Sequence, residues 1–204
     1  MVRTSGGPFH GGGLNGVLLI RHATTAAMRE ARFPAADDAD AGGLARARAL
    51  AGSLPDGPAW TSPARAARQT CAALGLDARP VAALAEADHG SWAGVRYADV
   101  DPGELDAWLS DPGAAPHGGE SRRELAARVG AWLAGRPSGV AVCDVGVIRA
   151  ALCHALGLSV RAADRIDLAP LSTTRLAAAR DGWRVAHVNR PYLRRPHTDR
   201  PHIN

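Results

Sequence analysis

A short apolar segment that ends directly in an Arg-His pair is the feature of this sequence that most restricts its fold. Residues 17–20 are Val-Leu-Leu-Ile, and Arg21 and His22 follow them. A continuous apolar run of this length is typical of a strand that is buried on both faces of a sheet. Open α/β sheets bind their ligands at the carboxyl ends of such strands. The segment therefore predicts a buried strand that places Arg21 and His22 at a ligand site.

A second segment of the same kind follows in the C-terminal half of the chain. Residues 140–143 are Val-Ala-Val-Cys, Asp144 comes next, and the helical spacing of residues 147–156 ends at Gly157. Three further helices are predicted: one over residues 44–54, one from Ser62 (N-cap) and Pro63 (first helical residue) to Gly75, and one from the capping box at residues 121–124 to residue 133. Residues 173–179 and 183–188 predict a hairpin around Asp181-Gly182. This alternation predicts an α/β fold with a mostly parallel sheet and helices on both faces.

The 204 residues are expected to form one domain with an irregular segment at each end. Residues 1–16 are rich in glycine and predict a flexible leader, whereas residues 17–189 carry the alternating pattern of the domain. Residues 190–204 contain three prolines and predict an irregular basic tail. Within the domain, residues 77–119 are the least regular part and are rich in Pro, Gly and Asp.

The positive charge of the chain is concentrated at its C-terminus. The formal net charge is +4, and all 24 basic residues are arginine. Residues 190–204 hold four arginines and one aspartate, which together account for +3 of that total. The domain itself is therefore close to neutral, unlike a protein that binds nucleic acid through a basic face. We expect no nucleic-acid partner, and we expect the tail to be solvated.

The three cysteines, Cys71, Cys143 and Cys153, have apolar neighbours and no metal-ligand spacing. Buried, reduced thiols are the best interpretation, and they favour a cytoplasmic location. The sequence has no apolar run of signal-peptide or membrane-spanning length. We therefore expect no metal site, no secretion and no membrane association.

Five short blocks occur in a fixed order along the chain. They are residues 17–25 (VLLIRHATT), 61–70 (TSPARAARQT), 84–94 (LAEADHGSWAG), 116–121 (PHGGES) and 140–149 (VAVCDVGVIR). In this order they resemble the histidine phosphatase superfamily, also called the phosphoglycerate-mutase-like fold, over about residues 17–189. Within it, the chain is similar to the small bacterial branch that includes phosphatases of the α-ribazole phosphatase type. The resemblance implies a three-layer α/β/α sandwich with a mixed, mostly parallel sheet. It also implies that residues 77–119 form a small cap of loops and short helices that selects the substrate.

The resemblance assigns roles to four side chains in these blocks. His22 would be the nucleophile that attacks phosphorus and forms a phosphohistidine, which water then hydrolyses. Arg21 and Arg65 would bind the phosphoryl oxygens with their guanidinium forks. Glu86 would protonate the leaving oxygen and later activate the water, with residues 88–89 as alternatives for this role. The mechanism implied by the family needs no metal and no other cofactor.

The sequence departs from the family pattern at its last block. Asp144 stands where a second phosphate-binding histidine is expected, Val145 replaces a small residue, and residues 23–24 also differ. A carboxylate about 4 Å from a phosphate charge repels it by on the order of 4 kcal/mol at an effective dielectric constant near 20. This repulsion would weaken phosphate binding, or slow the reaction, by about a thousandfold. Asp144 could become protonated, pair with Arg21 or Arg65, or act as acid or base on a different kind of substrate. We expect the pairing with arginine, because it needs no proton uptake.

The sequence leaves three interpretations of function. The first is a phosphomonoesterase that acts on a small phosphorylated metabolite through a phosphohistidine at His22, with an altered site. The second is an enzyme that uses Asp144 as an acid or base for non-phosphoryl chemistry in the same pocket. The third is a catalytically inactive protein that binds a ligand or a partner. An enzyme with a small anionic or phosphorylated substrate is the expectation, and the chain could form a homodimer; the irregular cap region carries no motif that identifies the substrate.

Overall fold

The computed structural model describes residues 15–192, so most of the expected leader and tail lies outside the described residues. The strands are β1 (Gly16–Arg21), β2 (Ala59–Thr61), β3 (Arg79–Pro80), β4 (Gly139–Cys143), β5 (Ser172–Ala179) and β6 (Gly182–Pro191). The α-helices are α1 (Ala26–Arg29), α2 (Ala41–Ala49), α3 (Arg65–Ala73), α4 (Pro102–Ser110), α5 (Arg122–Ala134), α6 (Val145–Leu156) and α7 (Val160–Ala163). Three short 3-10 helices, η1 (Ala82–Leu84), η2 (Gly90–Trp92) and η3 (Tyr97–Asp99), lie between β3 and α4.

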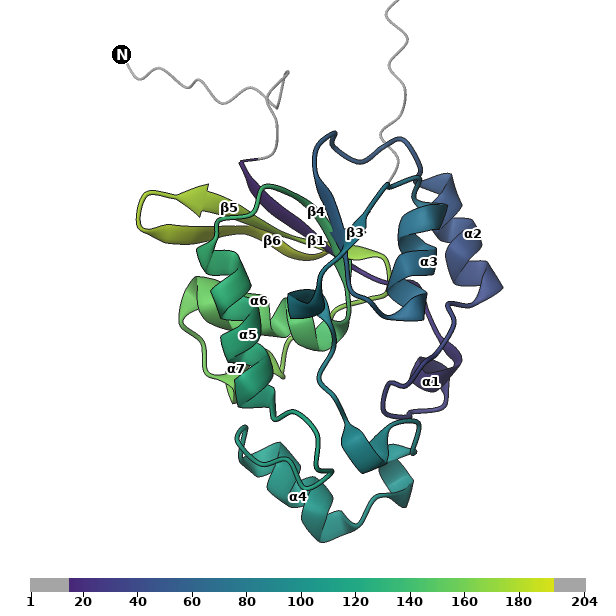
Figure 1. The fold of residues 1–204 in the computed structure, drawn as a ribbon, viewed down its shortest axis with the longest axis vertical. Coiled ribbons are helices and arrows are strands. Elements are labelled where there is room, and N and C mark those ends of the chain that lie inside the picture. Colours follow the sequence, from purple (N-terminus) through teal and green to yellow (C-terminus); the bar gives the residue numbers. More distant parts are fainter. Residues whose placement is uncertain (1–14, 193–204) are drawn as a thin grey trace, which may run out of the picture.

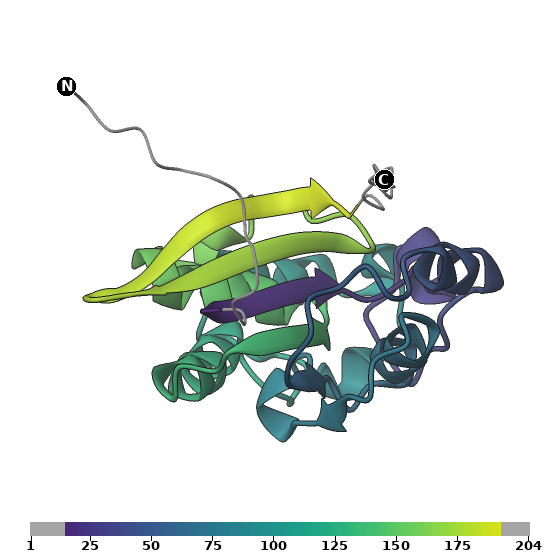
Figure 2. The same ribbon diagram turned by 90° about the horizontal axis from the view of Figure 1, so that it is seen from above.

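The six strands form one mixed sheet in the order β3-β2-β4-β1-β5-β6. The first four strands are parallel, and β5 and β6 are antiparallel additions at one edge, where they form a long hairpin (Figure 2). Helices α2 and α3 cover one face of the sheet, and α5 and α6 cover the other (Figure 1). The expected α/β/α sandwich with a mostly parallel mixed sheet is therefore confirmed.

The central strands are buried on both faces, as their continuous apolar sequences predict. In β1, Val17 and Leu19 pack into the core beneath α5 and α6, whereas Leu18 and Ile20 pack into the core beneath α2 and α3. Successive side chains of a strand point to opposite faces, so a strand that serves two cores must be apolar at every position. Strand β4 is divided between the two cores in the same way.

The pairing of β1 with β4 places the ends of the two strands side by side. Arg21 lies opposite Cys143 in the parallel ladder, and the backbone N–H of His22 donates to the carbonyl oxygen of Cys143 over 3.0 Å. His22 and Asp144 are the next residues of their respective strands. The register therefore brings the two residues to the same point at the carboxyl edge of the sheet.

Several predicted boundaries differ from the structure. Helix α2 covers residues 41–49 rather than 44–54, with the side chain of Asp40 as its N-cap. Helix α3 begins at Arg65 rather than at Pro63, and its N-cap residue is Ala64 in a non-helical conformation. The N–H of Ser62 donates to the carbonyl oxygen of Val142 at 2.8 Å and so continues the pairing of β2 with β4. Strand β1 begins at Gly16, and β6 covers Gly182–Pro191 rather than the predicted 183–188.

Other local predictions are confirmed. The capping box at Ser121 is complete, since its hydroxyl accepts from the N–H of Glu124 and the Glu124 carboxylate accepts from the N–H of Ser121. Helix α6 ends at Gly157 in the left-handed conformation. The predicted hairpin is present, but its turn lies at residues 180–181, one position earlier than predicted, and Gly182 is the first residue of β6. None of the helices in residues 15–192 combines the length and the apolar character that crossing a bilayer requires.

A cap of short helices and loops covers one end of the sheet, in the lower part of Figure 1. Its core is aromatic, with Phe33 fully buried and in ring contact with Trp92, Tyr97 and Trp108. The buried side chain of Arg122 fastens this cap to the rest of the domain, since it pairs with Asp164 and donates to the carbonyl oxygen of Trp108.

Two cap segments touch at Gly90, and this contact yields a prediction. Gly90 has φ +47°, and a Cβ atom there would lie 2.1 Å from the carbonyl oxygen of His117, which is backbone and has little freedom to move. Gly118 has φ +73° but open space around it. We expect Gly90→Ala to lower the free energy of unfolding by about 1–3 kcal/mol more than Gly118→Ala, because only the former adds overpacking to backbone strain. Urea denaturation measures this difference, and equal losses for the two variants would contradict the packing described for the cap.

Candidate active site

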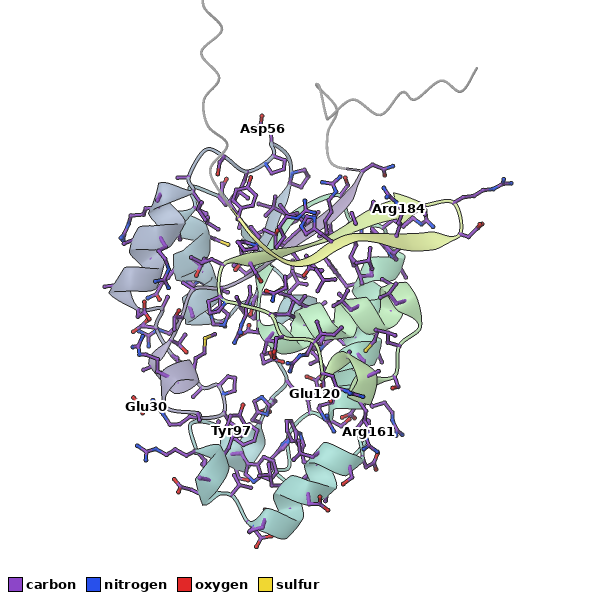
Figure 3. All side chains as sticks on the ribbon, turned by 180° about the vertical axis from the view of Figure 1, so that it is seen from behind. Glu30, Asp56, Tyr97, Glu120, Arg161 and Arg184 are labelled. Atoms are coloured by element: carbon purple, nitrogen blue, oxygen red, sulfur yellow. The ribbon has the colours of Figure 1, made fainter. Side chains whose placement is uncertain are left out.

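A cavity of about 200 Å³ opens at the carboxyl ends of β1 and β4. Arg21 and His22 reach it from β1, Asp144 from β4, Glu86 from the loop after η1, and Tyr97 from η3 in the cap. Tyr97 is labelled in Figure 3, where it lies on the cap side of the domain. Four of the five site residues predicted from sequence therefore meet in one cavity.

The imidazole of His22 is held at both nitrogens. Its Nδ1 lies 2.7 Å from the carbonyl oxygen of Ala23, and its Nε2 lies 2.9 Å from Oδ1 of Asp144. A carbonyl oxygen and a carboxylate both accept hydrogen bonds, so the ring satisfies both partners only when both of its nitrogens carry protons. The buried pair is therefore best described as an imidazolium–carboxylate pair.

The pKa of His22 reflects this arrangement. Burial disfavours the charged ring and acts to lower its pKa, but the hydrogen bond to Asp144, the charge of Asp144 and the hydrogen bond to Ala23 outweigh it and raise the pKa of His22 above its usual value. The position of Asp144 beside the ring is thus the main reason that His22 favours its protonated form.

The expected pairing of Asp144 with arginine is wrong. Its Oδ1 bonds to His22, and its Oδ2 is buried without a hydrogen-bond partner in the described part of the chain. The Nη1 atom of Arg21 donates instead to the carbonyl oxygen of Leu168. The cause lies in the sheet register, which places His22, not a guanidinium, directly beside the residue that follows β4.

Glu86, rather than the N-cap residue Asp144, caps the N-terminus of helix α6. Asp144 is the N-cap of α6, yet its side chain makes no capping hydrogen bond, although aspartate is among the favoured N-cap residues. Oε2 of Glu86 accepts from the N–H of Gly146 over 2.8 Å, in the first turn of α6, and Oε1 accepts from the N–H of Ala87 over 2.9 Å. Glu86 therefore caps the helix, and Asp144 is free to bind His22.

The surroundings of Glu86 suit a proton donor. Burial, followed by the charge of Asp144, raises the pKa of Glu86 to about 7, in spite of its two backbone hydrogen bonds. A carboxyl group with a pKa near neutral pH can both donate and accept a proton during turnover. The two alternatives for this role do not line the cavity: Asp88 accepts from the N–H of Gly90, and His89 packs against Phe33.

Arg65 is not part of this cavity. Its side chain is 57 % exposed and forms an ion pair with Asp38 at 2.7 Å, whereas Ala64 and Ala66 line the cavity wall. Arg65 is the first residue of α3, and Ala66 lies about 100° further round the helix, so Ala66 can line the cavity while Arg65 faces solvent. Arg21 is thus the one arginine of the predicted phosphate clamp that the structure places in the cavity.

Several residues near the site carried no prediction from sequence, among them Arg32 and Asp37, whose charged side chains line the cavity. Tyr97 lies in the irregular cap, where no periodic pattern singles it out. Arg149 belongs to the last sequence block, and its guanidinium donates twice to the carbonyl oxygen of Ile166, at 3.1 and 3.0 Å. The position of Arg149 in that sequence block could have marked it as a residue near the site. Within residues 15–192, no three His, Cys, Asp or Glu side chains converge in a way that would hold a metal ion.

Comparison with known proteins agrees with this arrangement. Residues 17–191 match the family model of the histidine phosphatase superfamily (branch 1). The glucosyl-3-phosphoglycerate phosphatase of Mycobacterium tuberculosis is 33% identical over 124 residues, and that of Mycolicibacterium vanbaalenii is 34% identical over 124 residues. These matches cover 55% of this chain and 56% and 55% of the relatives, so the chain spans about half the length of the curated relatives it matches.

Solved structures match over a larger share of the chain. The mycobacterial glucosyl-3-phosphoglycerate phosphatase in complex with VO3 has a TM-score of 0.74 and 28% identity, over 86% of this chain and 99% of that one. A phosphoglycerate mutase from Thermus thermophilus has a TM-score of 0.70 and 31% identity, over 84% of this chain and 96% of that one. Together with the family match over nearly all of the described residues, these similarities establish that the chain belongs to branch 1 of the histidine phosphatase superfamily.

Proposed function

We propose that this chain hydrolyses phosphomonoesters of small metabolites through a phosphohistidine at His22, and that Asp144 restrains this nucleophile. The observation that carries the proposal is the convergence of His22, Arg21 and Glu86 on one cavity at the carboxyl edge of the sheet. Family membership supports it, and relatives named glucosyl-3-phosphoglycerate phosphatases support a phosphorylated metabolite as the substrate. A substrate of the α-ribazole phosphate type remains a prediction.

The proposed reaction has two displacements. Nε2 of His22 attacks phosphorus while the bond from phosphorus to the leaving oxygen breaks, and Glu86 gives its proton to that oxygen. Water then attacks the phosphohistidine, Glu86 takes a proton from this water, and inorganic phosphate leaves with the histidine restored. Arg21 stabilises the negative charge on the phosphoryl oxygens throughout.

Nε2 is the nitrogen that can attack, because Nδ1 is bound to the carbonyl oxygen of Ala23. The same Nε2 is bound to Oδ1 of Asp144 in the structure. A phosphoryl group and Asp144 therefore compete for one atom, and attack requires the carboxylate of Asp144 to turn away. We interpret Asp144 as the residue that stands in place of the second phosphate-binding histidine of the family, and as the restraint on activity.

Protonation adds a second restraint. Attack needs a neutral His22, whose pKa is raised, and a protonated Glu86, whose pKa is about 7. Activity therefore falls as the pH drops through the pKa of His22, and it falls again as the pH rises through the pKa of Glu86. Because the two conditions oppose one another, we expect a narrow pH profile with a low maximum.

A catalytically inactive ligand-binding protein is the second candidate. It is favoured by the bond that covers Nε2 of His22 and by the placement of Arg65 outside the cavity. Non-phosphoryl chemistry with Asp144 as acid or base is a third, favoured by the unpartnered Oδ2 atom of that residue. A cytoplasmic location remains part of the proposal, in keeping with the unpaired cysteines. A homodimer remains a prediction.

The first prediction concerns the restraint at Asp144. Replacement by His or Asn removes a carboxylate beside the phosphoryl site, and we expect kcat/KM for phosphomonoesters to rise by about a hundredfold to a thousandfold. Phosphate release from a substrate panel measures the change. Asp56→Asn is the matched control, because Asp56 is exposed and lies at the far end of the molecule from Tyr97 (Figure 3). His22→Ala should abolish turnover in every background.

Two results would oppose this account. If neither the native chain nor Asp144→His releases phosphate above the His22→Ala background, the chain is not a phosphatase, and ligand binding becomes the leading function. If native turnover equals that of Asp144→Asn, the carboxylate does not restrain His22.

A pH prediction follows from the same charges. The charge of Asp144 raises the pKa values of both His22 and Glu86, so Asp144→Asn should move both limbs of the kcat/KM profile to lower pH. Glu86→Gln keeps an oxygen that can accept from the N–H of Gly146, but it has no proton to exchange. We expect it to lower kcat about 100-fold or more and to remove the alkaline limb. If both limbs of the kcat/KM profile stay at the same pH in Asp144→Asn, the roles assigned to His22 and Glu86 are wrong.

A further inference from the structure

Two histidines are packed into the aromatic core of the cap. His89, which precedes η2, is in ring contact with Phe33, and the two ring centroids are 5.0 Å apart. His117 contacts the ring of Trp92 at the same centroid distance of 5.0 Å. The two imidazoles also contact each other, with centroids 5.7 Å apart, and both residues are almost fully buried. The core of the cap therefore contains two titratable rings among its aromatic side chains.

The hydrogen bond of His117 requires the neutral form of its ring. Its Nδ1 accepts from the backbone N–H of Gly119 over 3.0 Å, so in this arrangement Nδ1 carries no proton and Nε2 carries one. Protonation of Nδ1 would turn two N–H donors toward each other and break this bond.

This bond lies where two segments of the cap are joined. The N–H of Ser91 donates to the carbonyl oxygen of His117 over 2.9 Å. The N–H of Glu120 donates to the carbonyl oxygen of Asp88 over 2.7 Å. A positively charged His117 would therefore weaken the junction between residues 88–91 and residues 117–120.

Neither imidazole has a partner that would stabilise a positive charge. Within residues 15–192 neither forms an ion pair with a carboxylate, in contrast to His22, which pairs with Asp144. Nδ1 of His89 and Nε2 of His117 are buried without a hydrogen-bond partner in the same part of the chain. Burial of an unpaired charge is costly, so the closed cap favours both rings in their neutral form.

The charged groups around the two rings do not reverse this preference. Burial, followed by the charge of His117, lowers the pKa of His89 to about 4, although the charges of Asp88, Asp144 and Glu120 act to raise it. Burial also lowers the pKa of His117, against the charge of Asp88. The three carboxylates have other partners, namely the N–H of Gly90 for Asp88, Arg128 for Glu120 and His22 for Asp144.

The remaining side of His89 faces a cavity of about 110 Å³ between the cap and helices α5 to α7. On this side, Arg122 lies over the ring of Trp108, 4.7 Å from its centroid, and adds a positive charge next to the aromatic core. The other ionisable residues that line the cavity are Glu86, Tyr97, Arg149, Cys153 and Asp164.

We infer that the cap is an acid-sensitive lid, which is closed while His89 and His117 are neutral and opens when they take up protons. Tyr97 packs on Phe33, with ring centroids 4.3 Å apart, and it also lines the catalytic cavity on the cap side (Figure 3). Release of the aromatic core would therefore remove one wall of that cavity. This lid does not depend on the proposed phosphatase activity, since its opening is measured without a substrate.

The direction of the pH effect follows from the linkage between proton uptake and opening. Above about pH 6.5 the two imidazoles are neutral in both the closed and the open cap, so opening does not depend on their titration. Below this pH the open cap binds protons that the closed cap excludes. Each such histidine then raises the equilibrium constant for opening by up to about tenfold per pH unit. For His89 this increase ends at about pH 4, where the closed cap takes up the proton as well.

Amide hydrogen exchange of the full chain, measured by mass spectrometry between about pH 5 and pH 7 and corrected for the intrinsic pH dependence of exchange, tests the lid. We expect the opening constant of peptides from residues 88–121 to rise by about tenfold or more from pH 7 to pH 5, whereas peptides from β1 and β4 keep their protection.

Variants identify the groups that titrate. His117→Asn keeps an oxygen that can accept from the N–H of Gly119 but cannot titrate, and His89→Phe keeps an aromatic ring beside Phe33. We expect the double variant to lose the rise in cap opening at acid pH. His187→Gln is the matched control and should keep the rise, because His187 lies in β6, where its Nε2 bonds to Oγ1 of Thr173.

Three results would overturn the lid. They are cap protection that does not change with pH in the native chain, an equal rise in the native chain and the double variant, and a parallel loss of protection in β1 and β4. Thermal unfolding shows whether each variant is folded. If the double variant does not fold, the single variants decide: a smaller rise in either supports the lid, and an unchanged rise in both overturns it.

Discussion

The buried hydrogen bond between His22 and Asp144 is the interaction on which the site depends. It follows from the ladder of two parallel strands, because Arg21 lies opposite Cys143 and the next residue of each strand meets its counterpart. Both side chains are almost fully buried, so removal of either partner leaves an uncompensated polar or charged group. The same bond determines which nitrogen of the ring is covered and which protonation state the ring favours.

The charges around this pair are mixed in sign. The cavity is lined by three carboxylates and two guanidinium groups, which belong to Asp37, Glu86, Asp144, Arg21 and Arg32. The charge of Asp144 contributes to the raised pKa values of both His22 and Glu86. The charges of Asp144 and Glu86 act to raise the pKa of Arg21, against the effects of its burial and of the charge of Arg149. The carboxylates therefore hold the protons that catalysis needs, and the guanidinium groups balance part of their charge beside an anionic substrate.

Much of the fold could be predicted from local signals, because residues 17–20 of β1 and residues 140–143 of β4 are continuously apolar and the capping box at Ser121 is complete. The side-chain partners could not be predicted in the same way. The sequence block that contains Arg65 predicts a place in the site, but the start and phase of α3 turn this side chain toward Asp38. The partner of Asp144 depends on the register between distant strands, and Tyr97 reaches the cavity through the irregular cap; neither relation is encoded in a short motif.

The protonation state of His22 tests directly whether the carboxylate of Asp144 holds and covers this nucleophile. Nitrogen-15 NMR of the labelled native chain follows both ring nitrogens of His22 through a pH titration, with Asp144→Asn as the reference. We expect His22 to titrate above the usual histidine pKa of about 6.5, and we expect this elevation of its pKa to disappear in Asp144→Asn. A native His22 that titrates at or below this usual value, with no change in the variant, would contradict the claim that Asp144 holds and covers the nucleophile.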